Sequence, residues 1–329
     1  MKKVLSILLS AALALCLAGC GADGPEVVPE YVLTYAENQP EDHPATLGAR
    51  KFADLVAERT GGKVVIQVKA DAEFGTQQEV LDQMAFGGID FARVSLSSIS
   101  DELPVLNVLQ LPFLYEDADH MWRVLDGQIG ADFLQVFQEQ GLVGLSWYDG
   151  GARSFYSTVP IRSVEDFAGL RIRVQDSQMM ADMVTLLGGI PETAAYNDVY
   201  AAFETGQIDG AENNWPSYLQ QAHYDLAPYY TVDAYTRVPE VQLASSRTWD
   251  ALPEEYRDII AQCAVESARY QRDIWTEQET LSRTEAIAGG CQEIRLSAAA
   301  CQEFRRTVQP LYEQYCAEYM DLIRQIQES

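Results

Sequence analysis

Hydrophobic and polar positions recur along this chain with two periods, one typical of strands and one typical of helices. Where apolar and often β-branched residues alternate with polar ones, the period of two predicts a strand. The segments with this pattern are 31–36, 63–69, 89–94, 142–148, 152–158, 171–175 and 208–212. Apolar residues at helical spacing predict helices over 46–59, 76–86, 178–187 and 198–205. This alternating order predicts an α/β fold with largely parallel sheets and helices on both faces.

The last quarter of the chain shows a longer helical pattern. A helix is predicted over 253–288, because Pro253 suits its first turn and no helix-breaking residue follows before Gly289. At about 1.5 Å per residue this helix would be roughly 50 Å long, which is longer than one domain is wide. We therefore expect it to brace two lobes. A final amphipathic helix is predicted over 297–326, with a bend at Pro310.

The first residues predict export from the cytoplasm. Lys2 and Lys3 form a basic start, and residues 4–19 are apolar or small throughout. This run is too short to span a bilayer comfortably and is typical of a signal peptide. Small residues followed by Cys20 resemble a bacterial lipoprotein signal, in which Cys20 becomes the lipid-bearing first residue. The alternative is an ordinary signal peptide with an incidental cysteine, and no later segment is a transmembrane candidate.

Composition narrows the classes of partner. With 329 residues, of which 47% are hydrophobic, the chain can form one large domain or two ordinary ones. It carries 49 acidic and only 23 basic residues, for a formal charge of −26, and loss of residues 1–19 would remove two more lysines. Such a field repels nucleic acid and anionic lipid headgroups, so we expect no nucleic-acid partner.

Cysteine and histidine positions give no sign of a metal centre or of catalysis. Four cysteines fall in the last quarter of the chain, where they are either small buried hydrophobes or partners in a disulfide: Cys263, Cys291, Cys301 and Cys316. The three histidines are scattered without metal-ligand spacing: His43, His120 and His223. Hydrolase, nucleotide-binding and calcium-binding motifs are missing from the sequence. We expect no cofactor, no metal, no catalytic residue and therefore no enzyme.

Arginine placed on strands, near glycine, asparagine and aromatic residues, is the main chemical signal. Arg93, Arg153 and Arg173 each occupy such a position, and Asn213 follows the strand at 208–212. Ligands of α/β proteins sit beyond the carboxyl ends of strands, and a guanidinium can grip a carboxylate with two parallel hydrogen bonds. Other arginines are interpreted as partners of surface acids: Arg162, Arg171, Arg257 and Arg272.

The region from Gly169 to Tyr218 resembles the DctP-type solute receptors of TRAP transporters, the tripartite ATP-independent periplasmic systems. The resemblance includes "GLRIRV", "AYNDVY" and "TGQIDGAEN", and extends to "YAENQPEDHPATLGARKFA" and "GGIDFARVS". It covers essentially the whole mature chain. Two departures fall near the pocket: Gln175 replaces a common proline, and residues 191–193 read Pro-Glu-Thr where Pro-Thr-Pro is frequent.

This resemblance implies a two-lobed, periplasmic-binding-protein-like fold that closes around a carboxylate ligand. Arg173 holds the position of the family's defining ligand contact, and Arg153 that of its second arginine. Asn213, Tyr196 and Asn38 match further pocket positions of the family. From the residues themselves we add Arg93 and Trp215 as ligand-binding candidates.

The expected function is that of an extracytoplasmic receptor, a monomer that delivers an organic acid to a TRAP permease. Several polar residues around Arg93 favour a sugar acid such as a hexuronate: Asn38, His43, Gln77 and Asn214. Dicarboxylates, other hydroxy acids and sialic-acid-like ligands stay open. So do an ABC-type receptor, an extracytoplasmic enzyme acting on sugar acids and a structural lipoprotein.

The first residues and the receptor hypothesis together predict how the chain is divided. The expected parts are a lipoprotein signal peptide (1–19), a linker after lipidated Cys20 (20–30), lobe I (31–150 and 239–278) and lobe II (151–238 and 279–329).

Overall fold

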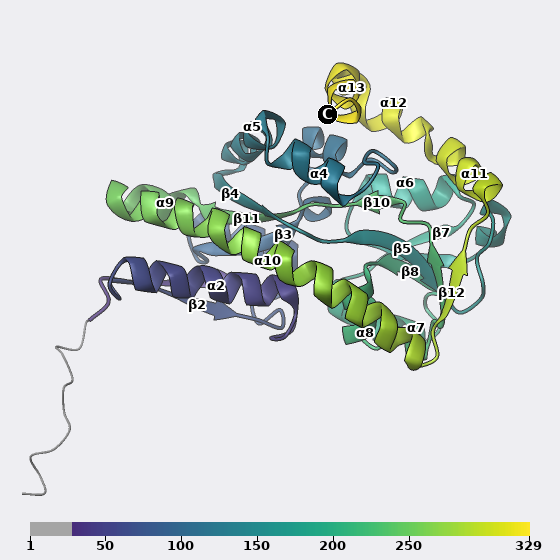
Figure 1. Cartoon of the computed structure of the whole chain (residues 1–329), viewed down its shortest axis with the longest axis horizontal. Coiled ribbons are helices and arrows are strands. Elements are labelled where there is room, and N and C mark those ends of the chain that lie inside the picture. The colour runs from purple at the N-terminus through teal and green to yellow at the C-terminus, as the bar shows by residue number, and fades with distance from the viewer. Residues whose placement is uncertain (1–27) are drawn as a thin grey trace, which may run out of the picture.

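The computed structural model describes residues 28–329, arranged around two β-sheets (Figure 1). The predicted signal peptide and Cys20 lie outside the described residues. The first sheet has the order β2-β1-β3-β11-β4 and comprises β1 (Tyr31–Ala36), β2 (Val64–Lys69), β3 (Phe91–Ser95), β4 (Leu142–Tyr148) and β11 (Glu240–Ser245). We call the part of the chain built on this sheet lobe I.

The second sheet forms lobe II and has the order β12-β9-β5-β8-β6-β7, with β10 paired to β5. Its strands are β5 (Ala152–Ser157), β6 (Arg171–Val174), β7 (Ile190–Thr193), β8 (Gly210–Asn213), β9 (Tyr229–Val232), β10 (Thr236–Arg237) and β12 (Gln292–Arg295). Both sheets are mixed rather than largely parallel as predicted. The antiparallel pairs all involve β5 or β11, which lie where the chain passes from one lobe to the other.

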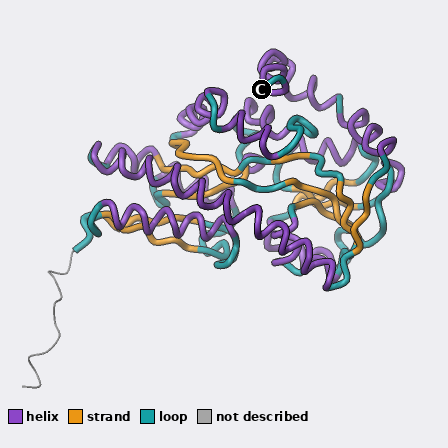
Figure 2. The backbone as a smooth tube through the Cα atoms, in the orientation of Figure 1, coloured by secondary structure: helices purple, strands orange, loops and turns teal. Residues whose placement is uncertain are grey.

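Helices cover these sheets and connect the lobes (Figure 2). They are α2 (Pro44–Arg59), α3 (Gln77–Phe86), α4 (Ala118–Leu125), α5 (Gln128–Val136), α6 (Gln178–Leu186), α7 (Val199–Glu204), α8 (Trp215–Gln220), α9 (Ser246–Ala251), α10 (Glu254–Ala288), α11 (Ala298–Val308), α12 (Pro310–Cys316) and α13 (Met320–Gln327). The single C-terminal helix predicted over 297–326 is therefore wrong. It is three helices, because the chain is redirected at Pro310 and again through a 3₁₀ turn at Ala317–Tyr319.

The long helix α10 spans both lobes, as predicted from the unbroken pattern over 253–288. It packs on α2 and β4 of lobe I and on α8 of lobe II, and Figure 1 shows it crossing the front of the molecule. The C-terminal helices return toward lobe I: Tyr312 donates to the Pro112 carbonyl at 2.9 Å, and His120 bonds the Ile326 carbonyl at 2.6 Å.

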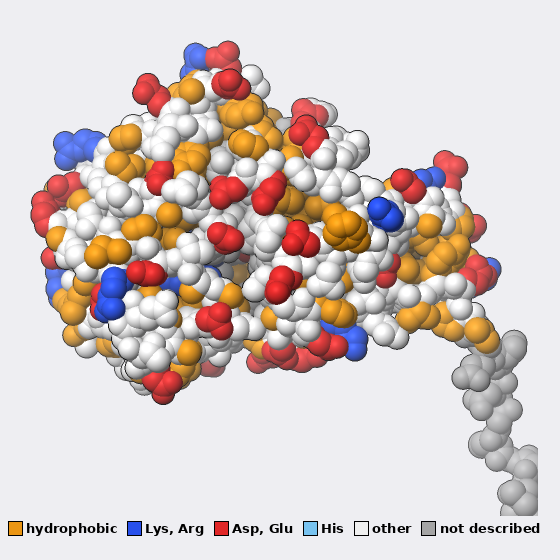
Figure 3. All heavy atoms as spheres, turned by 180° about the vertical axis from the view of Figure 1, so that it is seen from behind, with side chains coloured by type: hydrophobic (Ala, Val, Ile, Leu, Met, Phe, Trp, Pro, Cys, Tyr) orange, Lys and Arg blue, Asp and Glu red, His pale blue; other side chains and the backbone are white. Residues whose placement is uncertain are grey.

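The surface is acidic, as the net charge of the sequence predicts, and the cysteines follow one of the two alternatives left open above. On the face shown in Figure 3, acidic side chains are spread widely and outnumber basic ones. All four cysteines within residues 28–329 are free thiols, and three of them are buried. None of the helices between residues 28 and 329 is long and apolar enough to cross a membrane.

Candidate functional site

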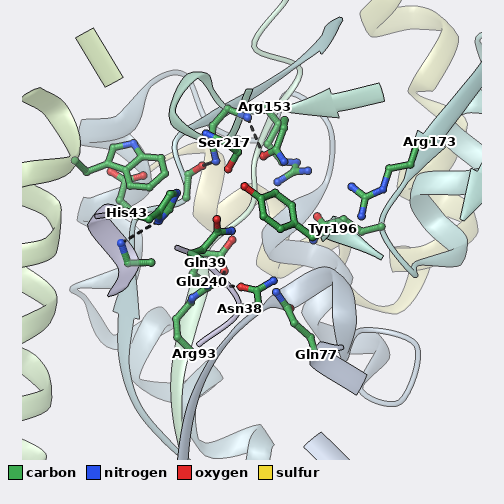
Figure 4. A pocket seen from close by; sticks show the side chains of 17 residues that line it. Asn38, Gln39, His43, Gln77, Arg93, Arg153, Arg173, Tyr196, Ser217 and Glu240 are labelled. Carbon is green, nitrogen blue, oxygen red and sulfur yellow. Dashed lines mark hydrogen bonds and ion pairs between the residues drawn. The ribbon is translucent and has the colours of Figure 1, made fainter. Parts of the chain in front are cut away.

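A polar cavity lies between the lobes, beyond the carboxyl ends of β1, β4, β6 and β8 (Figure 4). Lobe I and the start of the crossover to β5 contribute Asn38, Gln39, His43, Ala45, Gln77, Arg93, Asp149, Gly150 and Glu240. Lobe II contributes Arg153, Arg173, Gln175, Tyr196, Asn213, Asn214 and Ser217, and α10 contributes Trp275. A neighbouring groove of about 420 Å³ shares five residues with this cavity: Asn38, Gln77, Arg173, Gln175 and Tyr196.

Helix caps hold several of these residues in place. His43 caps α2, and its Nδ1 accepts from the Ala45 N–H at 3.1 Å. Thr76 and Glu79 form a capping box at the start of α3, which fixes Gln77 in the first turn. Asn214 caps α8 and also donates to the Gly150 carbonyl at 2.8 Å, so this side chain joins the two lobes.

Arg173 is a buried cation to which no residue from 28 to 329 offers a carboxylate partner. Its side chain lies on β6, and the residue is 3% exposed. Its Nε and Nη2 both donate to the Ala194 carbonyl, at 2.9 and 2.6 Å. Burial lowers the pKa of Arg173, and the nearby Glu212 charge opposes that effect without cancelling it. The guanidinium is therefore desolvated, still cationic, and able to bind an anion in the cavity.

Arg171, two residues earlier on the same strand, has a different environment. Its Nε and Nη2 donate to the Asp209 carboxylate at 2.8 and 2.7 Å, and its side chain is 38% exposed. The predicted ion pair of Arg171 with a surface acid is confirmed. Arg272 likewise pairs with Asp126 at 2.8 Å, as predicted. Arg171 and Arg173, which look alike in the sequence, thus differ in their partners: a carboxylate for Arg171 and a backbone carbonyl for Arg173.

Arg153 lines the cavity but is neutralised by Glu212. Its Nε and Nη2 donate to the two Glu212 carboxylate oxygens at 2.5 and 2.8 Å, and both residues are buried. Burial is the largest single influence and acts to lower the pKa of Arg153, but the charge and hydrogen bonds of Glu212, with smaller contributions from Tyr235 and Glu240, together raise it. Tyr235 also donates to Glu212 at 2.6 Å. Arg153 therefore has less positive charge to offer a ligand than Arg173 has.

Arg93 lines the cavity, but its guanidinium is fully engaged in a buried ion network. It donates to both oxygens of Glu37, to Glu240 at 2.7 Å and to the Asn38 side-chain oxygen at 2.6 Å. Every nitrogen of its guanidinium has a protein partner. Its position in the cavity agrees with the prediction, but its geometry indicates that it orients Asn38 and balances two carboxylates.

Five polar atoms of the cavity lining are buried and lack a hydrogen-bond partner among residues 28–329. They are Gln39 Oε1, His43 Nε2, Gln175 Oε1, Tyr196 Oη and Trp275 Nε1. Burial lowers the pKa of His43 to about 3, so the ring is neutral at physiological pH. Since Nδ1 accepts from Ala45, Nε2 carries the proton and is a donor. Buried polar groups are normally paired, so this cluster indicates a polar ligand.

The structure places six of the seven predicted ligand-binding residues around one cavity: Arg173, Arg153, Asn213, Tyr196, Arg93 and Asn38. Trp215, the seventh predicted residue, does not line this cavity. It is 6% exposed and stacks on Tyr230, with ring centroids 3.6 Å apart, inside the lobe II core. Its side chain packs on the sheet because it follows the Asn214 cap into the first turn of α8.

The sequence did not single out several further lining residues: Gln39, Asp149, Ser217, Glu240 and Trp275. Trp275 lies in the middle of α10, where only long-range packing directs it to the site. It is held against Gly151, which has a φ of 67°, and a Cβ on that glycine would come within 2.9 Å of the indole. No local pattern in the sequence marks such a contact.

Comparisons with known proteins agree with this architecture. The model of bacterial extracellular solute-binding protein family 7 (DctP) matches residues 35–318. A solute-binding protein of Chromohalobacter salexigens is 34% identical over 86% of this chain and 84% of its own length. The C4-dicarboxylate-binding periplasmic protein DctP of Rhodobacter capsulatus is 25% identical over 95% of this chain and 93% of its own.

Solved structures of TRAP periplasmic solute-binding proteins superpose closely on this fold. One from a Bradyrhizobium species, in complex with D-galacturonate, has a TM-score of 0.88 and 34% identity, covering 90% of this chain and 99% of its own. One from Pseudomonas putida, with bound D-glucuronate, has a TM-score of 0.88 and 31% identity, covering 91% and 97%. With the family matched over most of its length, this chain belongs to the family 7 (DctP) extracellular solute-binding proteins, the receptors of TRAP transporters.

Proposed function

We propose that this receptor binds a hexuronate, such as D-glucuronate or D-galacturonate, and delivers it to the membrane subunits of a TRAP transporter. The observation that carries the proposal is Arg173, a buried residue whose guanidinium, within the described part of the chain, donates only to a backbone carbonyl. A carboxylate is the group that would satisfy its charge and its remaining donors together. Family members of very similar structure have been solved with these two sugar acids bound.

The rest of the cavity suits the hydroxyl groups of a sugar. Tyr196, His43 and Trp275 offer unpartnered donors, and Gln39 offers an unpartnered acceptor. A C4 dicarboxylate would leave many of these groups unsatisfied, at a cost of about 1–3 kcal/mol for each one. The polar lining therefore favours a polyhydroxylated acid over a C4 dicarboxylate, which has few or no hydroxyl groups.

Ligand capture would couple to closure of the lobes. We keep the predicted division, 31–150 with 239–278 as lobe I and 151–238 with 279–329 as lobe II, as part of this proposal. Both lobes supply cavity residues, while α10 packs on both. A ligand held by Arg173 from lobe II and by Asn38 and His43 from lobe I would stabilise the closed arrangement, because it makes all its contacts only there.

Thermal unfolding of the purified protein tests the proposal. At a ligand concentration 1,000 times the dissociation constant, binding to the native state alone adds about 4 kcal/mol of stability. D-glucuronate or D-galacturonate should therefore raise Tm by several degrees, whereas succinate and malate should not. If neither hexuronate shifts Tm while a C4 dicarboxylate does, the proposed ligand class is wrong.

We also propose that the mature protein is tethered to the membrane through a lipid on Cys20, followed by a linker over 20–30. The support is the sequence alone: a basic start, an apolar run and small residues before the cysteine. In the native host the wild type should partition with membranes, and the Cys20→Ser variant should fail to do so. Recovery of the wild type in the soluble fraction would contradict the tether.

A further inference from the structure

We infer that this site accepts a sugar acid with one carboxylate and rejects the diacid of the same chain length. The chemical class is thus a uronate, with an uncharged end opposite its carboxylate, rather than an aldarate. This inference rests on the proposed function, which it makes more specific. It follows from how the charged groups around the cavity are already paired.

The positive charges of the lining are unequal in what they can offer. Arg93 faces two carboxylates, Glu37 and Glu240, and Arg153 is held by Glu212. Among the lining residues that the structure describes, Arg173 is the only cation that no carboxylate neutralises. One carboxylate of the ligand therefore has a strong partner in the protein, and a second one has none.

The side of the cavity away from Arg173 is acidic. Glu240 and Asp149 both line it and are buried. Glu240 accepts from Arg93 at 2.7 Å, and Asp149 accepts from the Gly151 N–H at 2.7 Å and from Trp122 Nε1 at 3.3 Å. In Figure 4, Glu240 and His43 lie on the opposite side of Tyr196 from Arg173. A second ligand carboxylate reaching that region would meet like charges in a poorly hydrated space.

Two nearby arginines do not supply a free positive charge to this acidic side of the cavity. Arg237 acts on Asp149 but also on Glu279, and neither Arg237 nor Glu279 lines the cavity. Arg272 acts on Asp149 too, but it pairs with Asp126 outside the lining.

Two further features of the same region could affect how it binds an anion, and neither provides a strong anion-binding group. The α2 N-terminus faces the cavity, but its Ala45 N–H is bonded to His43. Burial raises the pKa of Asp149, and a protonated Asp149 would still supply no cation.

Neutral polar groups complete the same region. His43 Nε2, Trp275 Nε1 and Gln39 Oε1 are buried there without partners, and a neutral imidazole and an indole donate well to hydroxyl oxygens. The ring oxygen and hydroxyls at the uncharged end of a uronate would bond these groups. The acidic side chains can accept from hydroxyl groups, which a carboxylate cannot supply.

Calorimetric titration with D-glucuronate and D-glucarate tests this inference. Glucarate has a second carboxylate in place of the aldehyde carbon through which glucuronate closes its ring, so the two acids differ in ring form as well as in charge, and the variants below isolate the contribution of charge. The wild type should bind glucuronate at least about 100-fold more tightly at pH 7.5. Glu240→Gln should reduce this ratio at least tenfold by removing one repelling charge. Asp149→Asn should change the ratio in the same direction but by less, because burial raises the pKa of Asp149 and so reduces its negative charge. It serves as a second variant in case loss of the Arg93 partner unfolds the first.

The outcomes separate the inference from the proposed function. Equal affinity of the wild type for both acids would overturn the inference while leaving a sugar-acid receptor in place. An unchanged ratio in folded forms of both variants would overturn the assigned cause. Failure of the wild type to bind D-glucuronate, D-glucarate and also D-galacturonate would overturn the proposed function and this inference with it.

Discussion

Replacing Arg173 by glutamine should reduce hexuronate affinity by at least about 30-fold, because removal of one partner of a buried, hydrogen-bonded charge pair costs roughly 2–5 kcal/mol. The residue is 3% exposed, and its guanidinium has no carboxylate partner among residues 28–329. Its loss should therefore leave the ligand's carboxylate without its counter-charge. The ligand-free variant should be as stable as the wild type or more so, since a desolvated charge has been removed.

Arg171→Gln is the matched control for this variant. It changes the same residue type on the same strand, but removes a partly exposed pair with Asp209. Such pairs contribute about 0–1 kcal/mol to stability, and this one lies outside the cavity lining. Titration calorimetry should show wild-type affinity for Arg171→Gln. Equal affinities of both variants and the wild type would mean that Arg173 does not hold the ligand.

Replacing Arg93 by methionine should destabilise the protein itself, by about 3–5 kcal/mol, because it leaves buried carboxylates uncompensated. Glu37 and Glu240 are 2% and 8% exposed, and both accept from this guanidinium. Urea unfolding of the ligand-free protein measures the loss. Adding Glu37→Gln and Glu240→Gln to Arg93→Met should recover part of it, since the stranded charges are then removed.

Arg50→Met supplies the comparison for an exposed ion pair. Arg50 and Glu41 are 42% and 59% exposed, so this change should cost no more than about 1 kcal/mol. If Arg93→Met were as stable as Arg50→Met but failed to bind hexuronates, Arg93 would be a ligand contact, as the sequence suggested, and not part of a structural network.

Much of the fold could be predicted because local patterns determine it. The strand at 31–36 and the long helix over 253–288 were found almost to the residue, since a clear period and flanking Pro or Gly residues mark them. The strand directions could not be read in this way. β11 runs antiparallel to both β3 and β4 because the chain has just crossed back from lobe II, and no local pattern records that crossing.

The site was predicted only in part, for a related reason. Arg173 lies in a recognisable motif, but the difference between Arg93 and Arg173 depends on partners far away in the chain. Glu37 and Glu240 are 56 and 147 positions from Arg93. Among 49 acidic residues, nothing local identifies these two. Trp275 is also contributed from a distance, through the packing of α10 against the crossover between the lobes.

A crystal structure of the protein grown with D-galacturonate would test the central claim most directly. We expect closed lobes, with the ligand's carboxylate bonded to the Arg173 guanidinium and its hydroxyls bonded to Tyr196, His43 and Trp275. A sugar acid whose carboxylate lies away from Arg173, or a ligand bound outside the cavity between the lobes, would contradict it.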